Sequence, residues 1–232
     1  RMRPLTLKTP KPLLEAGNKP LIVYHIERLV AAGLRDIVIN HAWLGEQIEQ
    51  TLGDGSDYGA RIEYSREGEP LETAGGIINA MPMLTAGNDD WFAVINGDIW
   101  TDFDFSRLTP STGDQACLVL TENPPQHPDG DFHLDPHNRV HDEGNRRLTF
   151  TGISLLHRSL FDQCPGGHAK LAPLLRAAMA RGQVSGLYHP GRWHDIGTPE
   201  GLQPLDRELK GSRPGGKGHP PGLVRSPRRR LF

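Results

Sequence analysis

Apolar residues along the chain alternate between helical spacing and strand-like runs. Helical spacing predicts helices over residues 18–33, 43–52, 73–83 and 170–181. Runs rich in β-branched or continuous apolar residues predict strands over 36–40, 60–65, 91–95, 116–122, 147–157 and 184–197. This alternation indicates an α/β fold, in which helices cover both faces of a mostly parallel sheet.

Three residues set expected helix boundaries. Asn18, followed by Lys19 and Pro20, is expected to cap the first helix, with the proline in its first turn. Gly33 is expected to end that helix, and Pro82 to close the helix over 73–83.

Two segments depart from this pattern. Residues 123–147 are dense in Pro, Asp, Asn and His, which predicts an excursion of short antiparallel strands and turns. Residues 211–232 are rich in Gly, Pro and Arg and have little apolar content, which predicts a disordered basic tail. Residues 1–210 are therefore expected to form the folded domain.

Composition and charge restrict the possible partners. The 232 residues are 36% hydrophobic, and no apolar run approaches the roughly 20 residues that a membrane span requires. The net charge is −2, but residues 211–232 hold six basic and no acidic residues, so residues 1–210 carry 20 basic against 28 acidic residues, or −8. We therefore expect no binding to nucleic acid or membrane, and the two unrelated cysteines, Cys117 and Cys164, favour a reducing cytoplasm.

Two aspartates lie at the ends of predicted strands. Asp98 ends the sequence Asn96-Gly97-Asp98 after a buried strand, and Asp195 lies in WHDIGT at 193–198, before a helix start. Asn96-Gly97-Asp98 alone is more typical of a simple turn than of a ligand site. Open α/β sheets, however, place ligands at the carboxyl ends of their strands, and two distant aspartates there are typical of a Mg²⁺ site.

A cationic segment opens the chain. Lys11 lies between Pro10 and Pro12, which restrict its backbone, and Arg1, Arg3 and Lys8 are near in sequence. Such a segment suits phosphate groups, although a solvated surface loop is the commoner explanation of a charge run.

Glycines and histidines mark two further candidates. Glu72-Thr73-Ala74-Gly75-Gly76 would weaken a helix start unless a ligand approaches the backbone closely or the glycines serve packing or a turn. Four histidines, at 127, 133, 137 and 141, do not match zinc-ligand spacing and are better explained as solvated side chains.

Taken together, these features resemble the sugar-1-phosphate nucleotidylyltransferases. The corresponding stretches are RMRPLT at 1–6, PKP at 10–12, LETAGGI at 71–77, NGDIW at 96–100, FTGIS at 150–154 and WHDIGT at 193–198. Their order and spacing match the family from residue 1 to about residue 210. Within the family, residues 39–45, 67–77 and 96–105 look most like the uridylyltransferases that act on N-acetylmuramate 1-phosphate in peptidoglycan recycling of the cell wall.

The resemblance implies a Rossmann-like three-layer α/β/α fold of the nucleotide-diphospho-sugar transferase type and a specific set of roles. The reaction would join UTP to a sugar-1-phosphate, giving a UDP-sugar and pyrophosphate, with Mg²⁺ as cofactor and a monomer or small homo-oligomer as the enzyme. The implied roles are metal binding by Asp98 and Asp195, phosphate neutralisation by Lys11 and Arg1, nucleotide binding by Glu72, Thr73, Gly75 and Gly76, and sugar binding by Asn96, Asp131 and Gly152.

Two departures from the family pattern keep alternatives open. No Glu-Lys-Pro precedes Gly152, which leaves open mannose-1-phosphate guanylyltransferase and glucose-1-phosphate thymidylyl- or uridylyltransferase activity. The family also has a central strand and a Gly-rich loop before the position of Arg1. A sheet without that strand would have two unpaired edges, so we expect an unstable or inactive chain. The missing Gly-rich loop leaves a non-catalytic nucleotide-sugar-binding protein as an alternative.

Overall fold

The computed structural model describes residues 6, 8–86, 89–211 and 230–231. Its α-helices are α1 (Leu21–Ala31), α2 (Gly45–Leu52), α3 (Glu72–Leu84), α4 (Leu171–Ala180) and α5 (Pro199–Gly211). Its strands are β1 (Glu15–Ala16), β2 (Lys19–Pro20), β3 (Asp36–His41), β4 (Arg61–Arg66), β5 (Trp91–Ile95), β6 (Ile99–Thr101), β7 (Ala116–Thr121), β8 (Phe132–Leu134), β9 (Val140–His141), β10 (Arg147–His157), β11 (Val184–Tyr188), β12 (Trp193–Asp195) and β13 (Arg230–Leu231). Short 3₁₀ turns lie at Lys11–Leu13, Ser56–Tyr58, Phe105–Arg107 and Arg158–Phe161.

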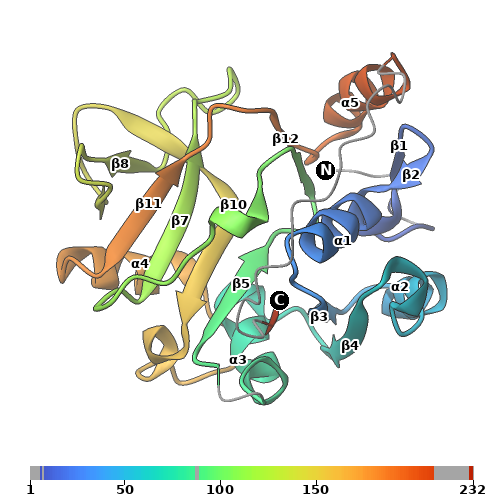
Figure 1. Ribbon diagram of the computed structural model, residues 1–232, viewed down its shortest axis with the longest axis horizontal. Helices are drawn as coiled ribbons and strands as arrows, with labels where there is room; N and C mark the ends of the chain where they lie inside the picture. The colour runs from blue at the N-terminus through green and yellow to red at the C-terminus, as the bar shows by residue number, and fades with distance from the viewer. Residues whose placement is uncertain (1–5, 7, 87–88, 212–229, 232) are drawn as a thin grey trace.

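A mixed sheet forms the middle of the molecule (Figure 1), with strand order β11-β7-β10-β5-β13-β3-β4. Neighbouring strands run parallel except at β10, which is antiparallel to both β5 and β7. β8 and β9, in the segment between β7 and β10, pair antiparallel with β10 and with each other. Because β10 runs antiparallel to β7, the segment with β8 and β9 connects these two strands without the crossover helix that a parallel pair would need. The predicted mostly parallel sheet is confirmed, with β10 as the exception.

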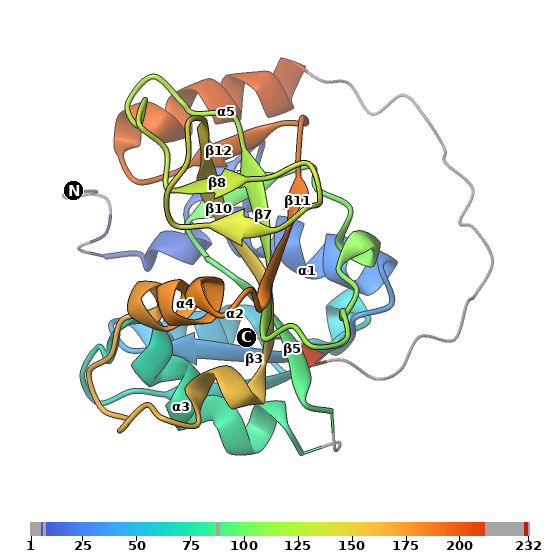
Figure 2. The same cartoon turned by 90° about the vertical axis from the view of Figure 1, so that its left-hand side faces the viewer.

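Helices cover both faces of the sheet. α1 and α2 pack on one face in a core that includes Ile37 and Ile39 of β3. α3 and α4 pack on the opposite face in a core that includes Val38. Figure 2 shows α1 and α4 on either side of the sheet. Successive side chains of a strand point to opposite faces, so β3 contributes to both cores, and the expected three-layer fold is confirmed.

A third, smaller core lies beside the sheet. It joins α5 and the β1–β2 hairpin to the antiparallel pair β6–β12, through Trp100, Ile196 and Leu205 among others. None of the helices in the described part of the chain combines the length and the apolar character that a membrane crossing needs.

Two predicted helix boundaries were wrong. Asn18 does not cap α1: it has φ 64°, next to Gly17 at φ 61°, and the two residues form the turn between β1 and β2. Two consecutive residues of positive φ are typical of a tight hairpin turn. Pro82 lies within α3, which continues to Leu84, a residue with no exposed surface. Burial of this last turn offsets the hydrogen bond that the proline cannot make.

The C-terminal residues differ from the predicted disordered tail at both of its described ends. Gly211 is the last residue of α5, and Arg230–Leu231 form β13 between β3 and β5. Residues 212–229 lie outside the described part. The two edges expected to be unpaired are therefore bridged over two residues, opposite Asp36 and Ile37 of β3 and Phe92 and Ala93 of β5.

Candidate active site

The turn after β5 is the centre of the candidate site. β5 ends at Ile95, and the chain passes through Asn96, Gly97 and Asp98 into β6. The backbone N–H of Asn96 donates to the carbonyl of Gly152, with an N–O distance of 2.9 Å, which ties this turn to β10. Asn96 lines three neighbouring cavities, of about 410, 390 and 360 Å³, so these cavities meet at the carboxyl end of β5.

Pairing of β6 with β12 brings the two predicted metal ligands to one place. Asp195 lies opposite Ile99, and the N–H of Ile196 donates to the carbonyl of Asp98 at 2.8 Å. The indole N–H of Trp193 donates to the carbonyl of Thr151 at 2.9 Å, which fixes β12 to β10. Asp98 and Asp195 both line the 360 Å³ cavity.

Lys11 completes this cluster. Its Nζ lies 2.7 Å from Oδ2 of Asp98, and the two side chains are 27% and 40% exposed. The structure thus places Lys11 at the cavity that both predicted metal ligands, Asp98 and Asp195, also line. An ammonium group that is only partly hydrated interacts strongly with phosphate oxygens, because less water competes for it.

The donor set fits Mg²⁺. Mg²⁺ prefers oxygen ligands, is often held by only one or two carboxylates, and usually keeps several waters or phosphate oxygens. Asp98 and Asp195 supply two carboxylates, and the described residues contain no group of three or more His, Cys, Asp or Glu side chains that could enclose a metal. The ammonium of Lys11 already holds one oxygen of Asp98, so this carboxylate is placed to interact with cations.

Three predicted sugar-binding residues lie together. Gly152 has φ 78°, and a Cβ there would lie 2.6 Å from Nδ2 of Asn96, so both its conformation and its contact with Asn96 require glycine. The carboxylate of Asp131 accepts the N–H of Phe150 at 2.8 Å and lies 3.2 Å from Nε2 of His127. Asn96, Asp131 and Gly152 all line both the 360 and 390 Å³ cavities.

The first residues of α3 give a different reason for the two glycines than ligand approach. A Cβ on Gly75 would lie 2.0 Å from the carbonyl oxygen of Gly167. The backbone N–H of Gly75 already donates to the carbonyl of Ala169, with an N–O distance of 3.1 Å. A Cβ on Gly76 would meet the side chains of Glu67 and Asn40, at 2.4 and 2.6 Å. Packing therefore explains both glycines, and the nucleotide binding expected of Gly75 and Gly76 stays a prediction.

Glu72 and Thr73 do line the candidate site. Both border the 410 and 390 Å³ cavities. Glu72 has φ 62°, a left-handed conformation that is uncommon outside glycine, and its carboxylate lies 3.7 Å from the imidazole of His168. Such strained residues concentrate at binding sites.

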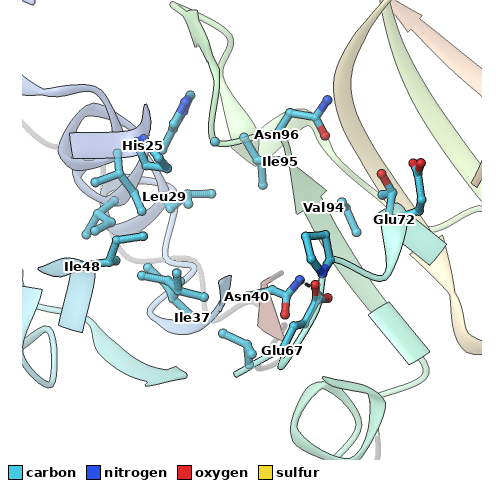
Figure 3. A pocket seen from close by; sticks show the side chains of 18 residues that line it. His25, Leu29, Ile37, Asn40, Ile48, Glu67, Glu72, Val94, Ile95 and Asn96 are labelled. Carbon is cyan, nitrogen blue, oxygen red and sulfur yellow. Dashed lines mark hydrogen bonds between the residues drawn. The ribbon is translucent and has the colours of Figure 1, made fainter. Parts of the chain in front are cut away.

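The 410 Å³ cavity contains polar groups that sequence analysis missed (Figure 3). The amide of Asn40 donates to Glu67 at 2.7 Å, and Glu67 also accepts the N–H of Leu71 at 3.1 Å. Oδ1 of Asn40 is buried without a hydrogen-bond partner among the described residues. Asn40 lies at the carboxyl end of the predicted strand over 36–40. Asp98 was predicted from the same kind of position, so the expectation of ligands at carboxyl ends of strands could also have identified Asn40.

His25 is the second missed group. Its Nε2 donates to the carbonyl of Ile99 at 2.8 Å, which links α1 to the residue after Asp98. Burial lowers its pKa from 6.5 to about 4, so the imidazole is neutral near pH 7. Nδ1 is then an acceptor, and it has no partner among the described residues. A histidine on the apolar face of a helix carries no signal that would separate this role from simple packing.

The remaining predicted groups are less informative. Arg1 lies outside the described residues. Three of the four clustered histidines lie beside acidic or backbone groups: His127 by Asp131, His141 by Asp135 at 3.0 Å, and His133 by the carbonyl of Arg146 at 2.8 Å.

The fold and the site together define a nucleotide-transferring enzyme on a Rossmann-like sheet. The chain belongs to the nucleotidyl transferase family, whose model matches residues 1–132. Its fold is also that of HddC from Yersinia pseudotuberculosis, with a TM-score of 0.75, 21% identity, and coverage of 90% of this chain and 94% of that one.

Two curated relatives differ in the reaction that their names give. The chain is 50% identical over 207 residues to the N-acetylmuramate alpha-1-phosphate uridylyltransferase of Neisseria meningitidis, covering 85% of this chain and 88% of that protein. It is 34% identical over 215 residues to a mannose-1-phosphate guanyltransferase of Gibberella zeae, covering 86% of this chain but only 58% of that protein.

Proposed function

We propose that this protein transfers the uridylyl group of UTP to N-acetylmuramate 1-phosphate, releasing pyrophosphate, as a step of peptidoglycan recycling in the cytoplasm. The 50% identity to a uridylyltransferase over most of both chains carries this proposal. The cluster of Lys11, Asp98 and Asp195 beside a sugar-sized cavity is the chemistry that such a transfer needs.

The reaction is a single in-line displacement. An oxygen of the sugar phosphate bonds to the α-phosphorus of UTP. The bond from that phosphorus to the oxygen bridging to the β-phosphorus breaks, and the electron pair leaves with pyrophosphate. Two anions must approach each other, so the protein contributes mainly positioning and positive charge.

Lys11 is proposed to hold the approaching phosphates. Its ammonium is held at 2.7 Å by Asp98 and lines the cavity with both aspartates, so it can neutralise charge without a large rearrangement. When bound by Asp98 and Asp195, Mg²⁺ would supply further charge neutralisation at the phosphates. Arg1, outside the described residues, stays a prediction for the phosphates that leave.

The sugar and the nucleotide are proposed to lie on opposite sides of Asn96. Asn96, Asp131 and Gly152 line the same cavity as Lys11, Asp98 and Asp195. Their polar groups suit the hydroxyl and amide groups of a sugar. Thr73, Glu72 and the Asn40–Glu67 pair line the larger, more apolar cavity, which suits a base and ribose.

A substrate panel tests the proposal. The protein is incubated with Mg²⁺, each nucleoside triphosphate in turn, and 1-phosphates of N-acetylmuramate, N-acetylglucosamine, glucose and mannose, and pyrophosphate release is measured. We expect the highest kcat/KM for UTP with N-acetylmuramate 1-phosphate. Faster release with GTP and mannose 1-phosphate would instead support guanylyl transfer. Calorimetric binding of UTP without release from any sugar would indicate a non-catalytic binding protein.

Two aspartate variants separate the site from general charge effects. Asp195→Asn should lower kcat by about 100-fold or more, because one preorganised charge at the reacting phosphates is worth several kcal/mol. Asp57→Asn, in an exposed 3₁₀ turn, removes the same charge far from the cluster and should leave kcat unchanged. Equal activity of the two variants would refute the assignment of Asp195.

A further inference from the structure

A cavity of about 390 Å³ beside the sugar-binding residues contains groups that the proposed reaction does not use. It lies against β10 and the start of α4, and it is lined by Ser154, Lys170, Leu171 and Ala172. It shares Asn96, Asp131 and Gly152 with the cavity that holds Lys11, Asp98 and Asp195. The two cavities are therefore adjacent, with the sugar-binding residues between them.

Polar groups in this cavity lack partners. Ser154 has no exposed surface, and its hydroxyl makes no hydrogen bond within the described part of the chain. A buried hydroxyl without a partner is unfavourable, so it needs a ligand or water to satisfy it. The ammonium of Lys170 has no hydrogen bond or ion pair with any residue that the structure describes.

The start of α4 adds positive potential at the same place. Lys170 is the residue before this ten-residue helix, and no side chain caps the first N–H groups, which belong to Leu171 and Ala172. Uncapped N–H groups and the helix dipole both favour an anion. Together with Ser154 and Lys170 they form a set of donors for which the described residues supply no acceptor.

The other charged groups lining the cavity already have partners. Asp131 lies beside His127 at 3.2 Å, and Glu72 lies 3.7 Å from His168. Arg176 forms an ion pair with Asp142 at 2.8 Å, outside the cavity. Among the described residues that line this cavity, Lys170 is therefore the cation left to receive a ligand.

The position of this donor set identifies the part of the substrate it faces. In the proposed reaction the 1-phosphate of a bound sugar lies at Lys11, in the neighbouring cavity. The sugar ring then lies at Asn96, Asp131 and Gly152, which line both cavities. Lys170 then faces ring substituents on the side away from the phosphate.

We propose that Lys170, the Ser154 hydroxyl and the N-terminus of α4 bind a carboxylate carried by the sugar ring. This inference rests on the proposed function, because the lactyl ether of N-acetylmuramate supplies that carboxylate and N-acetylglucosamine lacks it. Lys170 is thus the residue that selects the acidic sugar over its neutral counterpart.

Lys170→Gln tests the assignment, with N-acetylmuramate and N-acetylglucosamine 1-phosphates as paired substrates. The variant should lose about 10- to 100-fold in kcat/KM for the acidic sugar, mainly through KM, because a hydrogen-bonded charge pair is lost. Activity with the neutral sugar should stay within about twofold, since it has no group that reaches Lys170. Lys170→Arg should restore part of the loss, and Lys210→Gln, on α5, is the matched control.

The outcomes are separable. An equal loss with both sugars would mean that Lys170 contacts the common phosphate, and no loss would mean that it contacts neither; either result overturns the inference. Calorimetry of each sugar phosphate, with wild type and Lys170→Gln, needs no turnover. If wild type does not use N-acetylmuramate 1-phosphate, the proposed function fails. The subsite fails separately if Lys170→Gln leaves the ratio of the two affinities unchanged.

Discussion

The buried imidazole of His25 should make the free energy of unfolding depend on pH, and this dependence can be measured directly. This imidazole is buried on α1 and donates from Nε2 to Ile99. Burial is the largest cause of the fall in its pKa from 6.5 to about 4; the positive charge of Arg28 lowers the pKa further, whereas the hydrogen bond to Ile99 and the negative charge of Asp98 raise it. In the unfolded chain His25 takes up a proton near its ordinary pKa, so between pH 6.5 and 4 the unfolded state binds more protons.

The sign and size follow from linkage. The pKa is lower in the folded state, so the neutral form stabilises the fold fully above pH 6.5, and this contribution is lost as the pH falls towards 4. At ~1.36 kcal/mol for each pKa unit, the whole difference is worth about 3 kcal/mol. Between pH 7 and pH 5 the same two pKa values give a loss of about 2 kcal/mol.

His25→Gln removes the titration and keeps a donor for Ile99. Free energies of unfolding are measured by urea denaturation at pH 7 and pH 5 for wild type and variant. Other titrating groups contribute to both proteins, so wild type should lose about 2 kcal/mol more than the variant over this range. His137→Gln, with an exposed side chain, should behave like wild type. Equal pH dependence in wild type and His25→Gln, within about 0.5 kcal/mol, would refute the reasoning.

Two further predictions concern packing and a buried ion pair. Gly75→Ala forces a methyl group against the carbonyl of Gly167 and should destabilise the fold by about 1–3 kcal/mol in urea unfolding, whereas Gly68→Ala, with open space around it, should be nearly neutral. Equal effects would contradict the packing explanation. Asp114→Asn breaks a bidentate pair with Arg139, at 2.8 and 3.1 Å, in which the aspartate side chain is only 4% exposed. Loss of this buried charge should lower the melting temperature and cost about 3 kcal/mol; a change as small as that of an exposed pair would contradict the role of burial.

The sequence alone was sufficient to predict the strands that have strong local signals. β5 and β10 have the bounds predicted from their apolar runs, because buried strands need continuous apolar residues and the flanking turn residues end them. Asp98 and Asp195 were predicted as metal ligands from their positions at strand ends. Asn18 suited a helix cap or a hairpin turn, and Pro82 a helix end or a position within a helix. In both cases the prediction from the sequence was the wrong one of the two.

Only the tertiary structure decided which distant groups meet. Gly75 must be glycine because the backbone of Gly167, far along the chain, packs against it. Likewise, β6–β12 pairing brings Asp195 to Asp98, and β13 pairs with both β3 and β5. Lys170 gave no signal in the sequence, because a lysine before a helix is ordinary until the fold places it beside the cavity that we propose for the sugar. Sequence specifies which groups are present and the local conformation they favour, whereas packing determines which of them share a site and remain without a partner.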